Sequence, residues 1–267
     1  MPAMQRVGRA TAGCLALAAV FAVTGCSAHT AGDGQKVADW VAAEAHVSAA
    51  TSLVDTDLYN QSITLTVAVD PAITDEDLSQ LAVQTDHRAE DAGWSNPHIT
   101  YTLGANHSVS NVGGPTTLAV FDQLRHTDGY LAVNARGTVD CGGSFCVSVV
   151  STDPAALLAA ANQLIGVAAR VGGVQTNLFF AASTEGGRFV VRAQPGATPD
   201  AAVALWQSIA ATVPLARADA YEAETSDGSP PAPQLDLIVA SADQQATAER
   251  LVAAQTAVEA RVYLAAG

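Results

Sequence analysis

The chain has 267 residues, which is enough for one large domain or two small ones with a substantial core. Hydrophobic residues make up 49% of the sequence and charged residues 14%, and this composition excludes intrinsic disorder. Acidic side chains outnumber basic ones by 26 to 12, so the formal net charge is −14. A chain with this charge is repelled by nucleic acid and by anionic lipid surfaces, and we expect no nucleic-acid partner.

Residues 1–25 have the pattern of an export signal. Arg6 and Arg9 give a positively charged start, and an almost wholly apolar stretch follows from Ala10 to Val23. That stretch is shorter than the roughly 20 residues that span a bilayer as a helix, so we expect a cleaved signal peptide. The alternative is an anchor that stays on the protein. No later segment is expected to cross a membrane, because the most apolar one, Ala155–Val171, contains polar residues.

The segment Val23-Thr24-Gly25-Cys26 resembles the lipobox of bacterial lipoproteins, in which one aliphatic and two small residues precede the cysteine. The Ala-rich composition, with Lys36 as the only lysine, resembles that of actinobacterial proteins. The resemblance implies that Cys26 carries diacylglycerol, that signal peptidase cleaves between Gly25 and Cys26, and that the new amino group is acylated, for example with palmitate. It also implies a lipid anchor in the cell membrane and an extracytoplasmic location. Cleavage would change the formal net charge from −14 to −16.

Two cysteines remain after such processing, Cys141 and Cys146, and an oxidising envelope predicts a disulfide between them. The glycines that separate them allow the tight turn that this pairing needs. A redox-active dithiol is the alternative, but the spacing lacks the CxxC arrangement that lowers the pKa of a thiol. We therefore predict a structural disulfide that fixes one turn.

A strand–helix–strand pattern recurs along the chain. Its clearest copy begins with strict alternation of polar and apolar residues from Gln61 to Val69, continues through a helix capped by Thr74, and ends with a strand from His98 to Leu103. Three further copies are predicted over residues 146–182, 188–224 and 235–265. Two poorer copies are also predicted, and their parts are a helix Lys36–Glu44, a strand His46–Val54, a weak strand His107–Val112, a helix Thr116–Arg125 and a strand Gly129–Ala135.

Joined head to tail, these units predict an α+β fold of tandem split βαβ (ferredoxin-like) units, with antiparallel sheets and helices on one face. The similarity to envelope modules such as the BON domain is one of topology. A parallel doubly wound sheet is the alternative, but its strands would be continuous apolar runs, whereas most strands here alternate. The predicted organisation is a lipid-anchored flexible tether (26–34), an N-terminal module (35–137), a Gly-rich linker with the disulfide (138–145) and a C-terminal module of repeated βαβ units (146–267).

No strong catalytic motif occurs in the sequence, and we predict neither enzymatic activity nor a cofactor. The best metal candidate is weak: His87 and Asp91 lie four residues apart on a helix, and His98 starts the next strand. A solvated helix surface explains the same residues, so we predict no metal site. The large aromatic residues are expected in the core rather than in a ligand cage, and they are Trp94, Trp206, Phe179 and Phe180.

Taken together, these features predict an envelope lipoprotein that acts as a non-catalytic binding or scaffold module outside the cytoplasmic membrane. Its partner would be an envelope protein or polymer that the sequence does not identify. One alternative is a carrier of lipid or another amphiphile, which would need a roomy apolar cavity. A less favoured alternative is a hydrolase that uses the region around His87.

Overall fold

In this computed structural model, residues 30–55, 61–112, 115–135, 143–173, 178–223 and 232–265 are described. Their helices are α1 (Ala31–Ala42), α2 (Asp75–Asp91), α3 (Pro115–Arg125), α4 (Pro154–Gly172), α5 (Asp200–Ala210) and α6 (Ala242–Ala253). Their strands are β1 (Val47–Asp55), β2 (Ser62–Val69), β3 (His98–Leu103), β4 (His107–Ser110), β5 (Ala132–Ala135), β6 (Phe145–Val149), β7 (Phe180–Thr184), β8 (Phe189–Ala193), β9 (Leu215–Ala223), β10 (Ala232–Val239) and β11 (Glu259–Leu264). A short 3-10 turn, η1 (Glu185–Gly187), joins β7 to β8.

All eleven strands belong to one mixed sheet and lie in it in chain order, from β1 at one edge to β11 at the other. Neighbouring pairs alternate in direction, so that β1 is antiparallel to β2, β2 is parallel to β3, and the alternation continues to the parallel pair of β10 and β11. A helix joins the two strands of each parallel pair. Successive units begin 45, 38, 44 and 43 residues apart, a period typical of repeat proteins.

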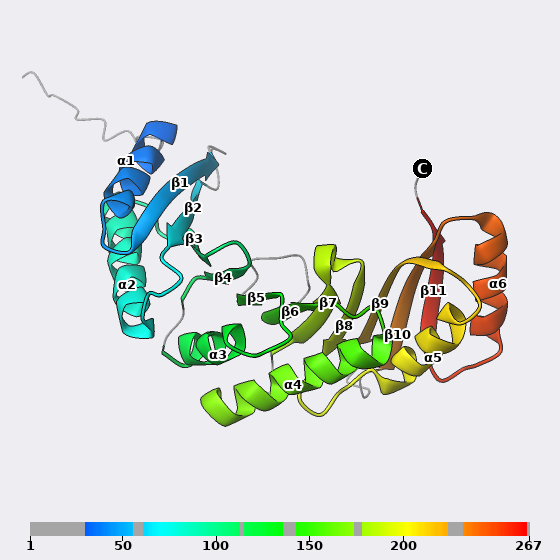
Figure 1. The fold of residues 1–267 in the computed structure, drawn as a ribbon. Coiled ribbons are helices and arrows are strands. Elements are labelled where there is room, and N and C mark those ends of the chain that lie inside the picture. The colour runs from blue at the N-terminus through cyan, green and yellow to red at the C-terminus, as the bar shows by residue number, and fades with distance from the viewer. Residues whose placement is uncertain are drawn as a thin grey trace, which may run out of the picture.

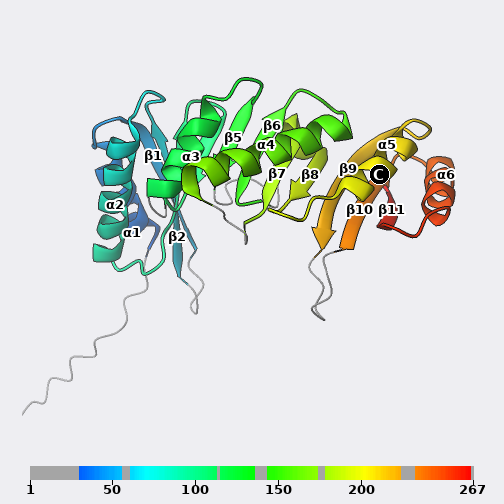
Figure 2. The ribbon, with the colours of Figure 1, turned by 90° about the horizontal axis from the view of Figure 1, so that it is seen from below.

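The helices α1 to α6 lie on one side of the sheet (Figures 1 and 2). The sheet curves so that this helix layer is on the outside and the other face lines the inside of the curve (Figure 1). Neighbouring helices contact one another in chain order. Two strands occupy about 9.6 Å of sheet and packed helices lie about 8–10 Å apart. One helix per strand pair therefore covers the outer face completely, and the inner face carries none of these helices.

The mixed α/β architecture and the repeated strand–helix–strand units are present, but tandem ferredoxin-like units are not. In a split βαβ unit another strand lies between the two strands that the helix connects. Here β2 pairs directly with β3, and β6 pairs directly with β7. The prediction of antiparallel sheets is wrong, because every unit contributes a parallel pair. Strand direction reverses from one unit to the next, while the helices stay on one face of the sheet. Consecutive βαβ crossovers therefore have opposite hand. Every second unit thus departs from the right-handed crossover that is usual in proteins.

The sheet continues across the predicted linker at residues 138–145. β5 and β6 pair antiparallel, with Ala132 opposite Ser148 and Ala135 opposite Phe145. The main hydrophobic cluster also extends from Val37 near one end of the described chain to Val258 near the other. The two predicted modules, residues 35–137 and 146–267, thus share one sheet and one core.

The predicted tether at residues 26–34 includes residues that are helical. α1 begins at Ala31, and Thr30 and Asp33 form a reciprocal capping box at its N-terminus. Gly34 sits inside this helix where a Cβ would come within 2.4 Å of Val54, so the helix approaches β1 closely. The small and polar residues of this segment predicted a flexible tether, but here Gly34 permits close packing.

The helix α4 packs in the centre of the outer layer, against α3, α5 and strands β6 to β8. With 19 residues and a mean hydropathy of 1.4, it is long and apolar enough to cross a membrane by length and composition alone. We expected the polar residues of this segment to exclude a membrane span, but the mean hydropathy stays in the range of membrane-spanning helices. Its buried positions include Leu157, Ala161, Leu164 and Ala168, which face the sheet in the same core as the strands.

Candidate binding face

The inner face of the sheet divides into two halves with different chemistry. Strand positions that alternate with the buried core residues point to this face. From β2 to β7 none of these positions carries Lys, Arg, Asp or Glu. We term this region the hydroxyl half, and its polar members other than His98 are Ser62, Thr64, Thr66, Thr100, Thr102, Ser108, Ser110, Asn134, Ser148 and Ser183.

Cross-strand hydrogen bonds order part of the hydroxyl half. The hydroxyls of Thr100 on β3 and Ser110 on β4 lie 2.6 Å apart, and Ser110 is fully buried. Ser108 donates to Asn134 Oδ1 on β5 at 2.5 Å, which leaves the amide nitrogen of Asn134 as a donor for other groups. These bonds join adjacent strands across both kinds of pairing, antiparallel and parallel.

A hollow of about 440 Å³ lies at one end of the hydroxyl half. It spans strands β3 to β6 and is bordered by the β3–β4 turn and by η1. Its lining is mostly polar and consists of Thr102, Gly104, Ala105, Asn106, His107, Ser108, Leu131, Ala132, Asn134, Ser148, Glu185 and Gly186. Burial, with further contributions from Arg125 and His126, lowers the pKa of His107, so this imidazole is neutral at neutral pH. Glu185 is then the one charged side chain of this lining.

From β8 to β11 the inner face carries charges that bond to one another. We term this region the charged half, and its polar members are Arg192, Arg217, Asp219, Tyr221, Gln234, Asp236, Glu259, Arg261 and Tyr263. Arg192 forms an ion pair with Asp219, and its guanidinium lies 5.1 Å from the ring centroid of Tyr221. Burial raises the pKa of Asp219, although Arg192 opposes this shift. Burial and the neighbouring Asp236 together thus raise this pKa by more than Arg192 and Arg217 lower it.

The network continues across the last two strands. The Tyr221 hydroxyl donates to Gln234 Oε1 at 2.9 Å and lies 3.2 Å from an Asp236 carboxylate oxygen. The Gln234 amide donates to Glu259 at 3.1 Å, and Arg261 donates to Glu259 at 2.7 Å. Side chains of the charged half therefore bond mainly to one another.

A second hollow, of about 340 Å³, lies beside the charged half. Phe179, Arg192, Gln194, Tyr221 and Glu222 supply its larger side chains. Phe179 was expected in the core but is only half-buried here, whereas Trp94, Trp206 and Phe180 are buried as predicted.

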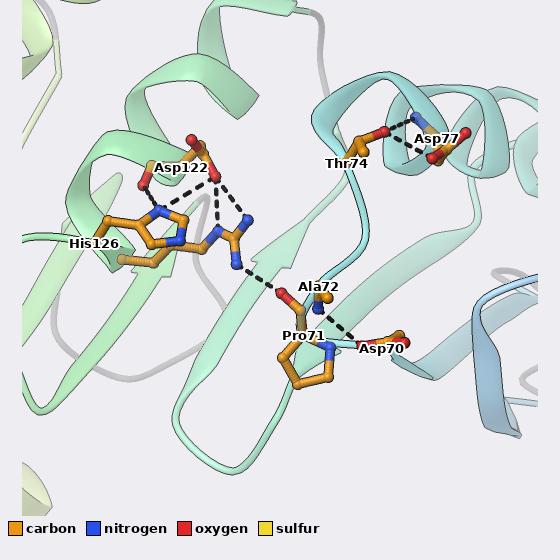
Figure 3. A network of polar contacts seen from close by, with 8 residues as sticks. Asp70, Pro71, Ala72, Thr74, Asp77, Asp122 and His126 are labelled. Carbon is orange, nitrogen blue, oxygen red and sulfur yellow. Dashed lines mark hydrogen bonds and ion pairs between the residues drawn. The ribbon is translucent and has the colours of Figure 1, made fainter.

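A separate polar network lies on the helix side, between α3 and the segment before α2 (Figure 3). Asp122 pairs with Arg125 at 2.7 Å and lies 3.5 Å from His126. Arg125 also donates to the carbonyl oxygen of Pro71 at 2.8 Å. This bond links the outer layer to the segment that leads into α2. Asp122 and Arg125 belong to α3 and His126 follows it directly, so the network has a structural role.

The weak metal candidates do not come together in the described ranges. His87 is an exposed residue of α2 and lies 3.7 Å from Glu90, and Asp91 is exposed at the end of the same helix. His98 belongs to the inner face, where its Nδ1 lies 3.3 Å from the Asn111 amide. No group of three His, Cys, Asp or Glu side chains that could hold a metal ion occurs among the described residues.

The processing and disulfide predictions fall largely outside the described residues. Gly25, Cys26 and Cys141 all lie there. Cys146 is described, is buried, and is not without a bonding partner. The pairing of Cys141 with Cys146 stays a prediction.

Sequence reasoning did not identify the hollow of the hydroxyl half. Polar residues that alternate with apolar ones in the predicted strands are among the residues that line it. We used this alternation only to recognise half-buried strands. Asn106 and Glu185 lie in turns, and no sequence spacing brings them together. Comparison with protein families, with curated proteins and with solved structures finds no match for the chain.

Proposed function

We propose that this protein is a lipid-anchored, non-catalytic binding or scaffold protein of the extracytoplasmic face of the cell membrane, and that its partner binds on the inner face of the sheet. The observation that carries the proposal is the inner face itself, which runs across eleven strands without a helix from the described chain. Curved repeat sheets offer extended concave surfaces for binding. An envelope protein or polymer would be the partner, and we expect no nucleic acid.

The anchor rests on the lipobox ending at Cys26. Only residues 27–30 separate Cys26 from the start of α1. A chain of this length reaches at most about 18 Å when fully extended. Two or three acyl chains at Cys26 would hold such a protein stably on a membrane. The folded part would therefore stay next to the membrane, with α1 and β1 nearest to the anchor.

Metabolic labelling with a fatty acid tests the anchor. We expect the label in the wild-type chain and in Cys14→Ser, which alters the other cysteine of the export signal, and we expect its loss in Cys26→Ser. A labelled, membrane-bound Cys26→Ser protein would contradict the anchor.

Site-specific photo-crosslinking in cells tests the binding face. Thr66 is exposed on the inner face of β2, and Gln84 is exposed on α2 in the helix layer. Because the two positions are close in sequence and both exposed, a crosslinker at each samples opposite faces of the same unit. We expect adducts from position 66 and few from position 84. Adducts from position 84 alone would place the partner on the helix layer and refute the proposed binding face.

A further inference from the structure

The hollow of the hydroxyl half combines three features that define its ligand. It lies on the inner face, it is bordered by two turns, and its volume of about 440 Å³ falls within the roughly 300–1,000 Å³ of ligand pockets. Its lining side chains come from strands β3 to β6 and from the turn after β7. A ligand there would contact several repeat units at once.

The polar groups of this lining are hydroxyls and amides, each of which both donates and accepts hydrogen bonds. Thr102 and Ser148 offer hydroxyls, and Asn106 and Asn134 offer amides. Asn134 accepts from Ser108 and so presents its amide nitrogen as a donor. Such a set matches a ligand whose own groups are hydroxyls.

The lining also provides an apolar surface and one carboxylate. Leu131 is 38% exposed and gives the hollow an aliphatic wall. Glu185 is exposed on the turn after β7 and can accept two hydrogen bonds from neighbouring hydroxyls. Hydroxyl groups around an aliphatic C–H face are the chemistry of a saccharide.

We propose that this hollow binds a neutral saccharide, either a free oligosaccharide or a segment of a polysaccharide. This inference rests on the proposed function, because it names the ligand class of the same inner face. The lining supplies no Lys or Arg to pair with a sulfate, phosphate or uronate. The net charge of the whole chain, −14, further disfavours anionic polymers. A single carboxylate without acidic neighbours in the lining gives little selectivity for cationic sugars.

The test is binding of the lipidated protein to an array of neutral, anionic and cationic oligosaccharides, with short peptides as a separate arm. Hits are then titrated in solution by calorimetry. Glu185→Gln is the main variant, because it changes one exposed side chain without changing its size and leaves the core intact. Asn134→Ala is the second variant. Glu222→Gln is the matched control, since it makes the same change in the hollow beside the charged half.

We expect neutral oligosaccharides to bind and anionic ones not to bind. Glu185→Gln and Asn134→Ala should each weaken the binding by about tenfold, the effect of one strong hydrogen bond, and Glu222→Gln should leave it unchanged. Binding only to charged glycans or peptides, no glycan binding, or equal effects of all three variants would overturn the saccharide assignment. The proposed function would survive each of these results if crosslinks still form from position 66, and it fails separately if they form only from position 84.

Discussion

The hydroxyl half and the charged half of the inner face are built on the same repeat but differ in what their polar side chains do. Both halves present alternate strand positions to the inside of the curve while the intervening positions form one core. In the charged half, Arg192, Tyr221 and Glu259 take part in a chain of contacts that spans four strands. In the hydroxyl half the groups are uncharged and border a polar hollow. Inner positions do not fill the core, so their chemistry can change without a change of fold.

The largest effect is expected where the charged half depends on a nearly buried ion pair. The side chain of Asp219 is 10% exposed, and that of Arg192 is 30% exposed. Asp219→Ala leaves Arg192 without its partner and should reduce the free energy of unfolding by about 2 kcal/mol. This is less than the loss for a fully buried pair, because water screens the partly exposed arginine. Urea denaturation measures this change.

The matched control is the double variant Arg192→Ala/Asp219→Ala. Because the double variant does not leave Arg192 without its partner, removing both charges should be less harmful than removing Asp219 alone. A double variant that is less stable than the single one would show that Arg192 stabilises the fold without Asp219, for example through its contact with Tyr221, and would contradict this view of the pair.

Single hydroxyl groups should contribute similarly to stability in both halves. Ser110→Ala removes the partner of Thr100 in the hydroxyl half, and Tyr221→Phe removes the hydroxyl that reaches Gln234 and Asp236 in the charged half. We expect each change to cost about 1 kcal/mol in the free energy of unfolding. A loss of several kcal/mol in Ser110→Ala would mean that the hydroxyl half holds the sheet together and is not available for a ligand.

The smallest effect concerns pH and comes from His107, which lies on the core side of β4, next to the hydroxyl half. The pKa of His107 is lower in the folded protein than its usual value of about 6.5. Folding therefore favours the neutral imidazole, and the resulting stability is present above about pH 6.5 and is lost as the pH falls through the folded-state pKa. Between about pH 7.5 and pH 5, thermal unfolding of His107→Gln should lose less stability than the wild type, by under about 1 kcal/mol. Equal losses would contradict the burial of this group.

The repeated units could be predicted because each element has a local signal. The alternation from Gln61 to Val69 and the cap at Thr74 locate β2 and the start of α2. The weaker copy from His107 is also present, as β4, α3 and β5. These signals depend only on residues close in sequence, so they survive the assembly of the sheet.

The pairing of units could not be predicted from the same signals. A split and a direct βαβ unit have the same order of elements, and the difference lies in which strand is the neighbour in space. The alternation of polar and apolar residues in most strands favoured the split arrangement over a parallel sheet, but it does not distinguish a split from a direct unit. The hollow was missed for a related reason, because Asn106, Asn134 and Glu185 are brought together only by sequential strand order.

The most direct test of the division between the halves is the ratio of crosslinks formed in cells from two exposed inner-face positions. Thr66 represents the hydroxyl half, and Tyr263, which is 46% exposed on β11, represents the charged half. A photo-crosslinker at each position in the full-length, lipidated protein reports what occupies that half. Our account predicts that adducts form mainly from position 66. Adducts mainly from position 263, with none from position 66, would contradict it.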